Sequence, residues 1–94
     1  MLSEQQIENR LRQGVKVAGG KALKFVSPGC RGVPDRLVFM PGGQIYLVEL
    51  KAPGKIPTAQ QNKRKKEFQE LGFKVYMIDT YEAVEGFLNE VLST

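Results

Sequence analysis

The sequence predicts an α/β domain in which seven elements follow in the order αβββαβα, with a mixed β-sheet flanked by helices. Three observations support this fold class. Two stretches begin with capping boxes, two strand-like stretches are joined by a Gly-Gly turn, and a helical stretch separates these strands from a later one. The 94 residues fit one domain spanning residues 1–94, because most domains contain about 50 to 200 residues.

The first helix is expected from about Glu4 to Val17. Ser3 and Gln6 have the spacing of a capping box, in which each side chain binds the backbone of the other residue. Gly19-Gly20 ends the helix. Between these signals, apolar residues recur at helical spacing, at Ile7, Leu11, Val15 and Ala18.

Three strands follow this helix. Apolar and polar residues alternate from about Ala22 to Val26, which predicts a strand, and the Pro- and Gly-rich residues 27–34 predict a loop. Residues 36–40 and 44–50 are rich in β-branched and aromatic side chains, and Pro41-Gly42-Gly43 joins them. We therefore expect a hairpin at the centre of the sheet.

A second capping box, formed by Thr58 and Gln61, begins the next helix. Phe68 and Leu71 are expected on its inner face, and Gly72 ends it. Residues beyond this glycine predict a buried strand, 73–79, and an amphipathic helix, Thr80–Leu92. Because a helix connects the hairpin to this last strand, the strand should lie parallel to one of the earlier strands.

Composition narrows the chemistry that the chain can perform. The net charge is +4 and the pI is about 9.4, which favours a polyanionic partner. Cys30 is the only cysteine, so no disulfide can form within the chain, and the absence of histidine removes the commonest zinc ligand and general base. With no signal sequence and no apolar run of about 18 residues, we expect a soluble, intracellular protein without a membrane partner.

Three charged residues lie where a buried hairpin would normally have apolar ones. Asp35 opens the first hairpin strand, and Glu49 and Lys51 close the second. Glu49 and Lys51 share a face, about 7 Å apart at the usual rise per residue. A two-residue Gly42-Gly43 loop would pair residues whose numbers sum to 85 and turn Asp35 to the other face. Sums of 84 or 86 bring Asp35 to the same face as Glu49 and Lys51. They also align the apolar residues of the two strands with each other, so we predict a three-residue or bulged turn.

Two neighbouring carboxylates in a partly buried place repel each other unless a cation compensates them. Oxygen ligands without histidine suit Mg²⁺ or Mn²⁺, and the backbone carbonyl of Leu50 could add a third oxygen to Asp35 and Glu49. Lys51 would then lie near the attacking water and a phosphate oxygen. Taken singly, each motif is more often structural: Asp35 as a turn residue, and Glu49 and Lys51 as a solvated strand end.

These motifs resemble those of a known family. A glutamate in the first helix, "GVPD" at the start of one strand, "VELK" at the end of the next and a glutamine early in the following helix resemble the VRR-NUC nucleases of the PD-(D/E)xK superfamily. The resemblance extends from Ile7 to "LGFKVYMID". It implies a restriction-endonuclease-like core, dependence on Mg²⁺ or Mn²⁺, and hydrolysis of DNA phosphodiester bonds, with catalytic and metal-binding roles for Asp35, Glu49 and Lys51.

Small members of this family are similar to Holliday-junction resolvases that act as homodimers, and many are carried by phages. The resemblance therefore implies a structure-specific endonuclease for branched DNA that works as a homodimer in the cytoplasm of a host cell. Two other classes stay open. One is an inactive DNA-binding or assembly module of the same fold, and the other is a metal site that only stabilises the protein.

Two further site residues carry alternatives. Glu8 best matches the first-helix glutamate of the family and is expected to complete the metal shell, directly or through water. Its rival, Glu4, is already explained by the favourable interaction with the helix dipole, and an ion pair with Arg12 would explain Glu8 structurally. Gln61, rather than its neighbour Gln60, matches the family glutamine near the catalytic lysine, although its capping box also explains it.

Basic residues are candidates for DNA contacts. The cluster from Lys63 to Lys66 spreads around more than half a helical turn, so its members cannot all face one phosphate backbone, and a solvated face is an equal alternative. The residues nearest the inferred site would give salt-dependent, sequence-independent affinity. These candidates are Arg31, Arg36, Lys55 and Lys63.

Overall fold

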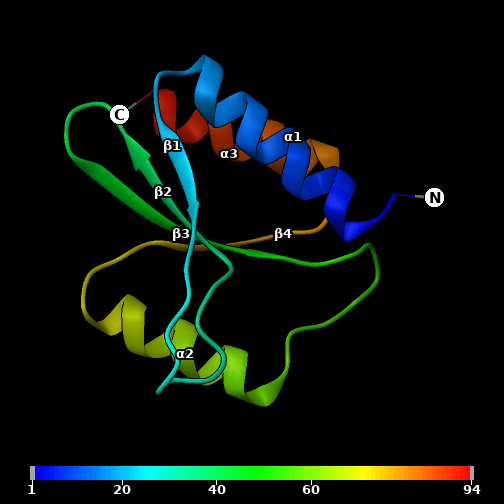
Figure 1. The fold of residues 1–94 in the computed structure, drawn as a ribbon, viewed down its shortest axis with the longest axis vertical. Coiled ribbons are helices and arrows are strands. Elements are labelled where there is room, and N and C mark those ends of the chain that lie inside the picture. Colours follow the sequence, from blue (N-terminus) through cyan, green and yellow to red (C-terminus); the bar gives the residue numbers. More distant parts are fainter. Residues whose placement is uncertain (1, 94) are drawn as a thin grey trace.

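The computed structural model describes residues 2–93 and confirms the predicted order αβββαβα (Figure 1). Its helices are α1 (Glu4–Val17), α2 (Ala59–Glu70) and α3 (Tyr81–Leu92). Its strands are β1 (Lys21–Lys24), β2 (Arg36–Met40), β3 (Gln44–Leu50) and β4 (Val75–Ile78). Within residues 2–93, no helix combines the length and the apolar character needed to cross a bilayer.

The four strands form one mixed sheet in the order β1-β2-β3-β4, so β2 and β3 are central, as predicted. The pairs β1–β2 and β2–β3 are antiparallel, whereas β4 lies parallel to β3 after the crossover through α2. In the hairpin, Arg36 pairs with Val48 and Met40 pairs with Gln44. These numbers sum to 84, which confirms the predicted three-residue turn, and Gly42 and Gly43 both adopt positive φ there.

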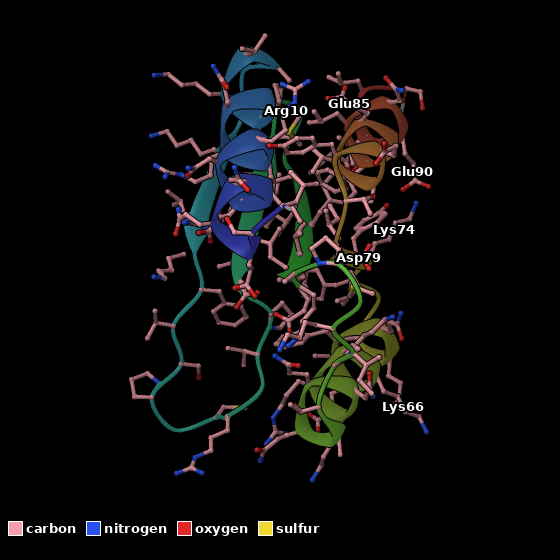
Figure 2. All side chains as sticks on the ribbon, turned by 90° about the vertical axis from the view of Figure 1, so that its right-hand side faces the viewer. Arg10, Lys66, Lys74, Asp79, Glu85 and Glu90 are labelled. Carbon is pink, nitrogen blue, oxygen red and sulfur yellow. The ribbon has the colours of Figure 1, made fainter. Side chains whose placement is uncertain are left out.

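Helices α1 and α3 lie together on one face of the sheet (Figure 1). Their apolar stripes and the inward side chains of the central strands form the core, with Ile7, Leu11, Val38, Val48 and Val84 fully buried. The side chains of Arg10 on α1 and Glu85 on α3 point toward each other and form an ion pair (Figure 2). This face therefore supplies most of the apolar burial that stabilises the domain.

The opposite face is covered only in part, by α2. The ring of Phe68 packs edge-to-face on Phe25, with 5.9 Å between centroids, but no residue of α2 is fully buried. Leu71 is 72% exposed, so the prediction that it supplies the inner face was wrong. The helix ends at Glu70, and Leu71 is its C-cap, where the chain already turns toward solvent.

Two strand predictions also need correction. The stretch 73–79 was predicted to be buried, but β4 is an edge strand in which only Ile78 is buried. As an edge strand, β4 has a neighbouring strand on one side only, and Phe73, which precedes it, is 41% exposed. The first strand ends at Lys24 rather than near Val26, because the chain leaves the sheet after the backbone N–H of Phe25 donates to the carbonyl of Asp35 at 2.9 Å.

Candidate active site

The hairpin register brings the three predicted charges to one corner of the sheet. Asp35 immediately precedes β2, Glu49 is the second-last residue of β3, and Lys51 follows this strand. Continuing the observed pairing places Asp35 opposite Glu49. One carboxylate oxygen of Asp35 accepts a hydrogen bond from the backbone N–H of Leu50 at 2.8 Å. The Asp35 carboxylate is therefore held against the end of β3.

Glu49 is the most unusual group at this corner. Glu49 is only 5% exposed, and among residues 2–93 neither of its carboxylate oxygens has a hydrogen-bond partner. Burial and then the neighbouring Asp35 carboxylate raise the pKa of Glu49 to about 8, while Lys51 lowers it and Glu4 raises it further. Without a cation, Glu49 is therefore protonated at neutral pH.

The donor set at this corner fits a hard divalent cation. Within residues 2–93, no three Asp, Glu, Cys or His side chains are grouped as a complete metal cage. Mg²⁺, however, usually takes only one or two carboxylates and fills its remaining positions with water and substrate oxygens. Asp35 and Glu49 supply two such carboxylates, and a bound cation would compensate the buried charge of Glu49.

The start of α2 closes the corner from the other side. Glu49, Gln61 and Lys65 line a cavity of about 10 Å³, close to the space that one water occupies. Gln61 also completes the predicted capping box: its side chain accepts from the N–H of Thr58 at 2.9 Å, and its own N–H donates to the Thr58 hydroxyl at 3.1 Å. One helix turn thus fixes the glutamine beside Glu49.

Gly32 allows the "GVPD" loop to reach this helix start. Its φ is +85°, and a Cβ at this position would lie 2.8 Å from the backbone of Gln60. Only glycine accommodates both the backbone conformation and the contact. Gly32 and Lys65 were not among the predicted site residues, although the "GVPD" motif contains the first and the basic cluster from Lys63 to Lys66 contains the second.

Glu8 does not lie with the carboxylate pair. Its side chain forms an ion pair with Arg36, at 2.9 Å between Oε2 and Nε. Arg36 is only 9% exposed, and its guanidinium also donates to the carbonyl of Ala22 at 3.1 Å. Both residues face the α1 side of the sheet, away from Glu49. The structure therefore places Glu8 and Arg36 together and apart from the Asp35–Glu49 carboxylate pair.

Glu4, the rival of Glu8, is closer to the site. It lies in the first turn of α1, and its charge raises the pKa of Glu49. The remaining basic candidates, Arg31, Lys55 and Lys63, are exposed. Of the two carboxylate candidates in the first helix, Glu4 is thus the one whose charge acts on Glu49.

The protonation of Glu49 makes the stability of the metal-free protein depend on pH. Between its ordinary pKa of 4.5 and its native value of about 8, Glu49 holds a proton in the native state but not in the unfolded state. The free energy of unfolding should therefore fall as pH rises through this window, by up to about 1.4 kcal/mol per pH unit. Thermal melting in chelator at a series of pH values measures this loss. Parallel pH profiles for the wild type and Glu49→Gln would contradict it.

The Glu8–Arg36 pair should contribute to stability. Glu8→Ala leaves a buried guanidinium without its partner and should lower the free energy of unfolding by about 3 kcal/mol. Replacing both partners with apolar residues, in Glu8→Leu/Arg36→Met, should recover part of this loss. Urea denaturation compares the two variants, and a loss below about 1 kcal/mol in Glu8→Ala would show that the pair is not structural.

Comparisons with known proteins agree with this geometry. No protein-family model matches the sequence. The chain is 46% identical, over 82 residues, to the protein named "Putative nuclease p44" of Acyrthosiphon pisum secondary endosymbiont phage 1, and the match covers 87% of this chain and 88% of that protein. A solved structure described as a VRR_NUC domain superposes with a TM-score of 0.86 at 25% identity, covering 92% of this chain and 94% of that one. The fold is restriction-endonuclease-like, and the chain belongs to the VRR-NUC family of nucleases.

Proposed function

We propose that this nuclease is a deoxyribonuclease that requires Mg²⁺ or Mn²⁺ and hydrolyses phosphodiester bonds in branched or junction-containing DNA. The observation that carries the proposal is the buried Glu49 carboxylate, which has no hydrogen-bond partner among the described residues and lies beside Asp35 and Lys51. A protein gains nothing in stability from such a group unless a cation compensates it.

Asp35, Glu49 and the carbonyl of Leu50 would hold the metal. The N–H of Leu50 points to Asp35, and in an extended strand the C=O of the same residue points to the same side. When bound, the cation supplies Lewis-acid polarisation of the phosphate. Asp35 is fixed by its hydrogen bond to the strand, so its carboxylate needs little reorganisation to bind.

Lys51 would act on the attacking water. Its ammonium is close enough to Glu49 to lower the pKa of that carboxyl, so it lies at the corner where phosphate must bind. There it can orient the water and offset the negative charge that develops on the phosphate oxygens. Gln61 would position the water from the α2 side, and Glu4 would complete the surroundings of the metal through an intervening water.

Substrate recognition would depend on the phosphate backbone. Arg31, Lys55 and Lys63 are exposed cations on the loops and helix around the site. Such contacts position DNA without reading bases, which leaves DNA shape as the source of selectivity. The cytoplasm of a cell that carries phage DNA is the compartment where this activity would operate.

The proposal includes a homodimer, because one site per chain can cut both strands of a junction only if two chains bind together. The sheet face that carries Asp35 and Glu49 continues into an apolar hollow of about 220 Å³. On this hollow, Phe39, Ile45 and Phe73 are 36%, 40% and 41% exposed. Exposed apolar surface of this kind is typical of a protein interface, and we assign the second copy to it.

Cleavage of defined DNA substrates tests the nuclease assignment. Labelled four-way junction, flap, nicked and plain duplex DNA are incubated with Mg²⁺, Mn²⁺ or chelator. We expect metal-dependent cutting, with the branched substrates preferred, and a loss of at least about 100-fold in both Asp35→Asn and Lys51→Met. Asparagine still accepts the hydrogen bond from Leu50, so the first variant should stay folded.

Lys66→Met is the matched control for Lys51→Met, because Lys66 is exposed on α2 and its side chain extends away from the sheet (Figure 2). It should retain wild-type cleavage. Binding without cutting in every condition would instead support an inactive DNA-binding or assembly module. Metal-dependent stabilisation without DNA binding would support a structural metal site.

The oligomeric state tests the apolar face. Sedimentation at micromolar concentration should give a dimer for the wild type and a monomer for Phe39→Asp/Ile45→Asp. Val17→Asp, at a position that is 84% exposed at the end of α1, should remain dimeric. A wild-type monomer at these concentrations would contradict the proposed assembly, as would equal dissociation of both variants.

A further inference from the structure

A second concave surface lies outside the active site, between α1 and the edge strand β1. This groove has a volume of about 530 Å³ and is lined by residues of both elements; β1 starts beside the C-terminal end of α1, and the two elements diverge from there (Figure 1). Three of its lining residues are cations, namely Arg12, Lys16 and Lys21, and two are amides, namely Asn9 and Gln13. Its lining contains no carboxylate.

The charge of this α1–β1 groove is uncompensated. The sequence has no Asp or Glu from Asn9 to Pro34, a segment that includes both walls. Arg12, Lys16 and Lys21 are all exposed, and none of them belongs to an ion pair within residues 2–93. By contrast, the neighbouring Arg10 is paired with Glu85. The groove therefore concentrates unpaired positive charge on one edge of the molecule.

One end of the groove lies near the start of β2. Asn9 on its helical wall is next to Glu8, whose carboxylate binds Arg36 at the start of β2. On its strand wall, Leu23 is two residues before Phe25, whose N–H donates to the carbonyl of Asp35. The strand wall of the groove thus continues along the chain to the backbone of Asp35, which immediately precedes β2.

We infer that the α1–β1 groove binds the phosphate backbone of the DNA duplex that flanks the scissile bond. This inference rests on the proposed DNA substrate. The helical wall from Asn9 to Lys16 is about 10 Å long at the rise of an α-helix. Successive phosphates of one DNA strand rise about 3.4 Å along the duplex axis, so a wall of this length, laid parallel to that axis, covers about three phosphate-to-phosphate steps.

Salt-dependent binding of a fluorescently labelled 30-base-pair duplex, measured by anisotropy in chelator so that no cleavage occurs, tests the inference. Lys16→Gln/Lys21→Gln should lower the slope of log affinity against log salt concentration by about 1.8, and adding Arg12→Gln should lower it by about 2.7 in total. Glutamine keeps the length and helix propensity of these exposed positions, so the fold should be preserved.

Lys66→Gln/Lys74→Gln removes the same charge from exposed positions on other surfaces, seen in Figure 2, and should change the slope by less than about 0.9. An equal decrease of the slope in both double variants would overturn the inference, since net charge alone would then explain the decrease.

Cleavage of a junction with Mg²⁺ separates this result from the nuclease assignment. A slope that falls in the groove variants, without DNA cleavage by the wild type, would support DNA binding by the α1–β1 groove and refute the nuclease assignment. Cleavage by the wild type with a slope that the groove variants leave unchanged would support the nuclease and refute binding by the groove.

Discussion

The register of the β2–β3 hairpin is the constraint on which the site depends. Pairing at a residue-number sum of 84 sets Asp35 opposite Glu49 and directs both, with Lys51, to one face. A shift by one residue would turn Asp35 to the α1 side and expose the apolar residues that now form the core. The three-residue turn, with two glycines at positive φ, fixes this register. The same feature therefore specifies both the fold and the position of the chemistry.

The buried carboxylate of Glu49 shows how the site departs from the rest of the protein. On the α1 side, the charged pair Glu8–Arg36 is compensated at 2.9 Å, whereas on the α2 side Glu49 has no hydrogen-bond partner among the described residues. The buried charge on the α1 face of the sheet thus has a partner within the protein, whereas the buried carboxylate on the α2 face has none among residues 2–93. The first pair stabilises the fold, and the second group is the one to which we assign the proposed metal.

Local sequence signals predicted much of this structure. Both capping boxes form as expected, and the alternation of apolar residues in the hairpin narrowed its register to residue-number sums of 84 or 86, of which 84 is observed. The errors arose where tertiary contacts decide. Helical spacing could not show that Glu8 pairs with Arg36, 28 residues later, or that Leu71 becomes a C-cap in solvent. Lys65 reaches the Glu49 cavity only because α2 packs on that face, which no local pattern records.

The release of protons on metal binding reports whether the buried Glu49 carboxylate is a metal ligand. Because Glu49 has a pKa of about 8 in the metal-free protein, Mg²⁺ or Mn²⁺ must displace its proton at pH 7. Calorimetric titration in buffers of different ionisation enthalpy counts these protons. The account predicts about one proton released per metal at pH 7 and almost none at pH 9.5, with binding strongly weakened in Glu49→Gln. Metal binding without proton release at pH 7, or with equal affinity in Glu49→Gln, would contradict it.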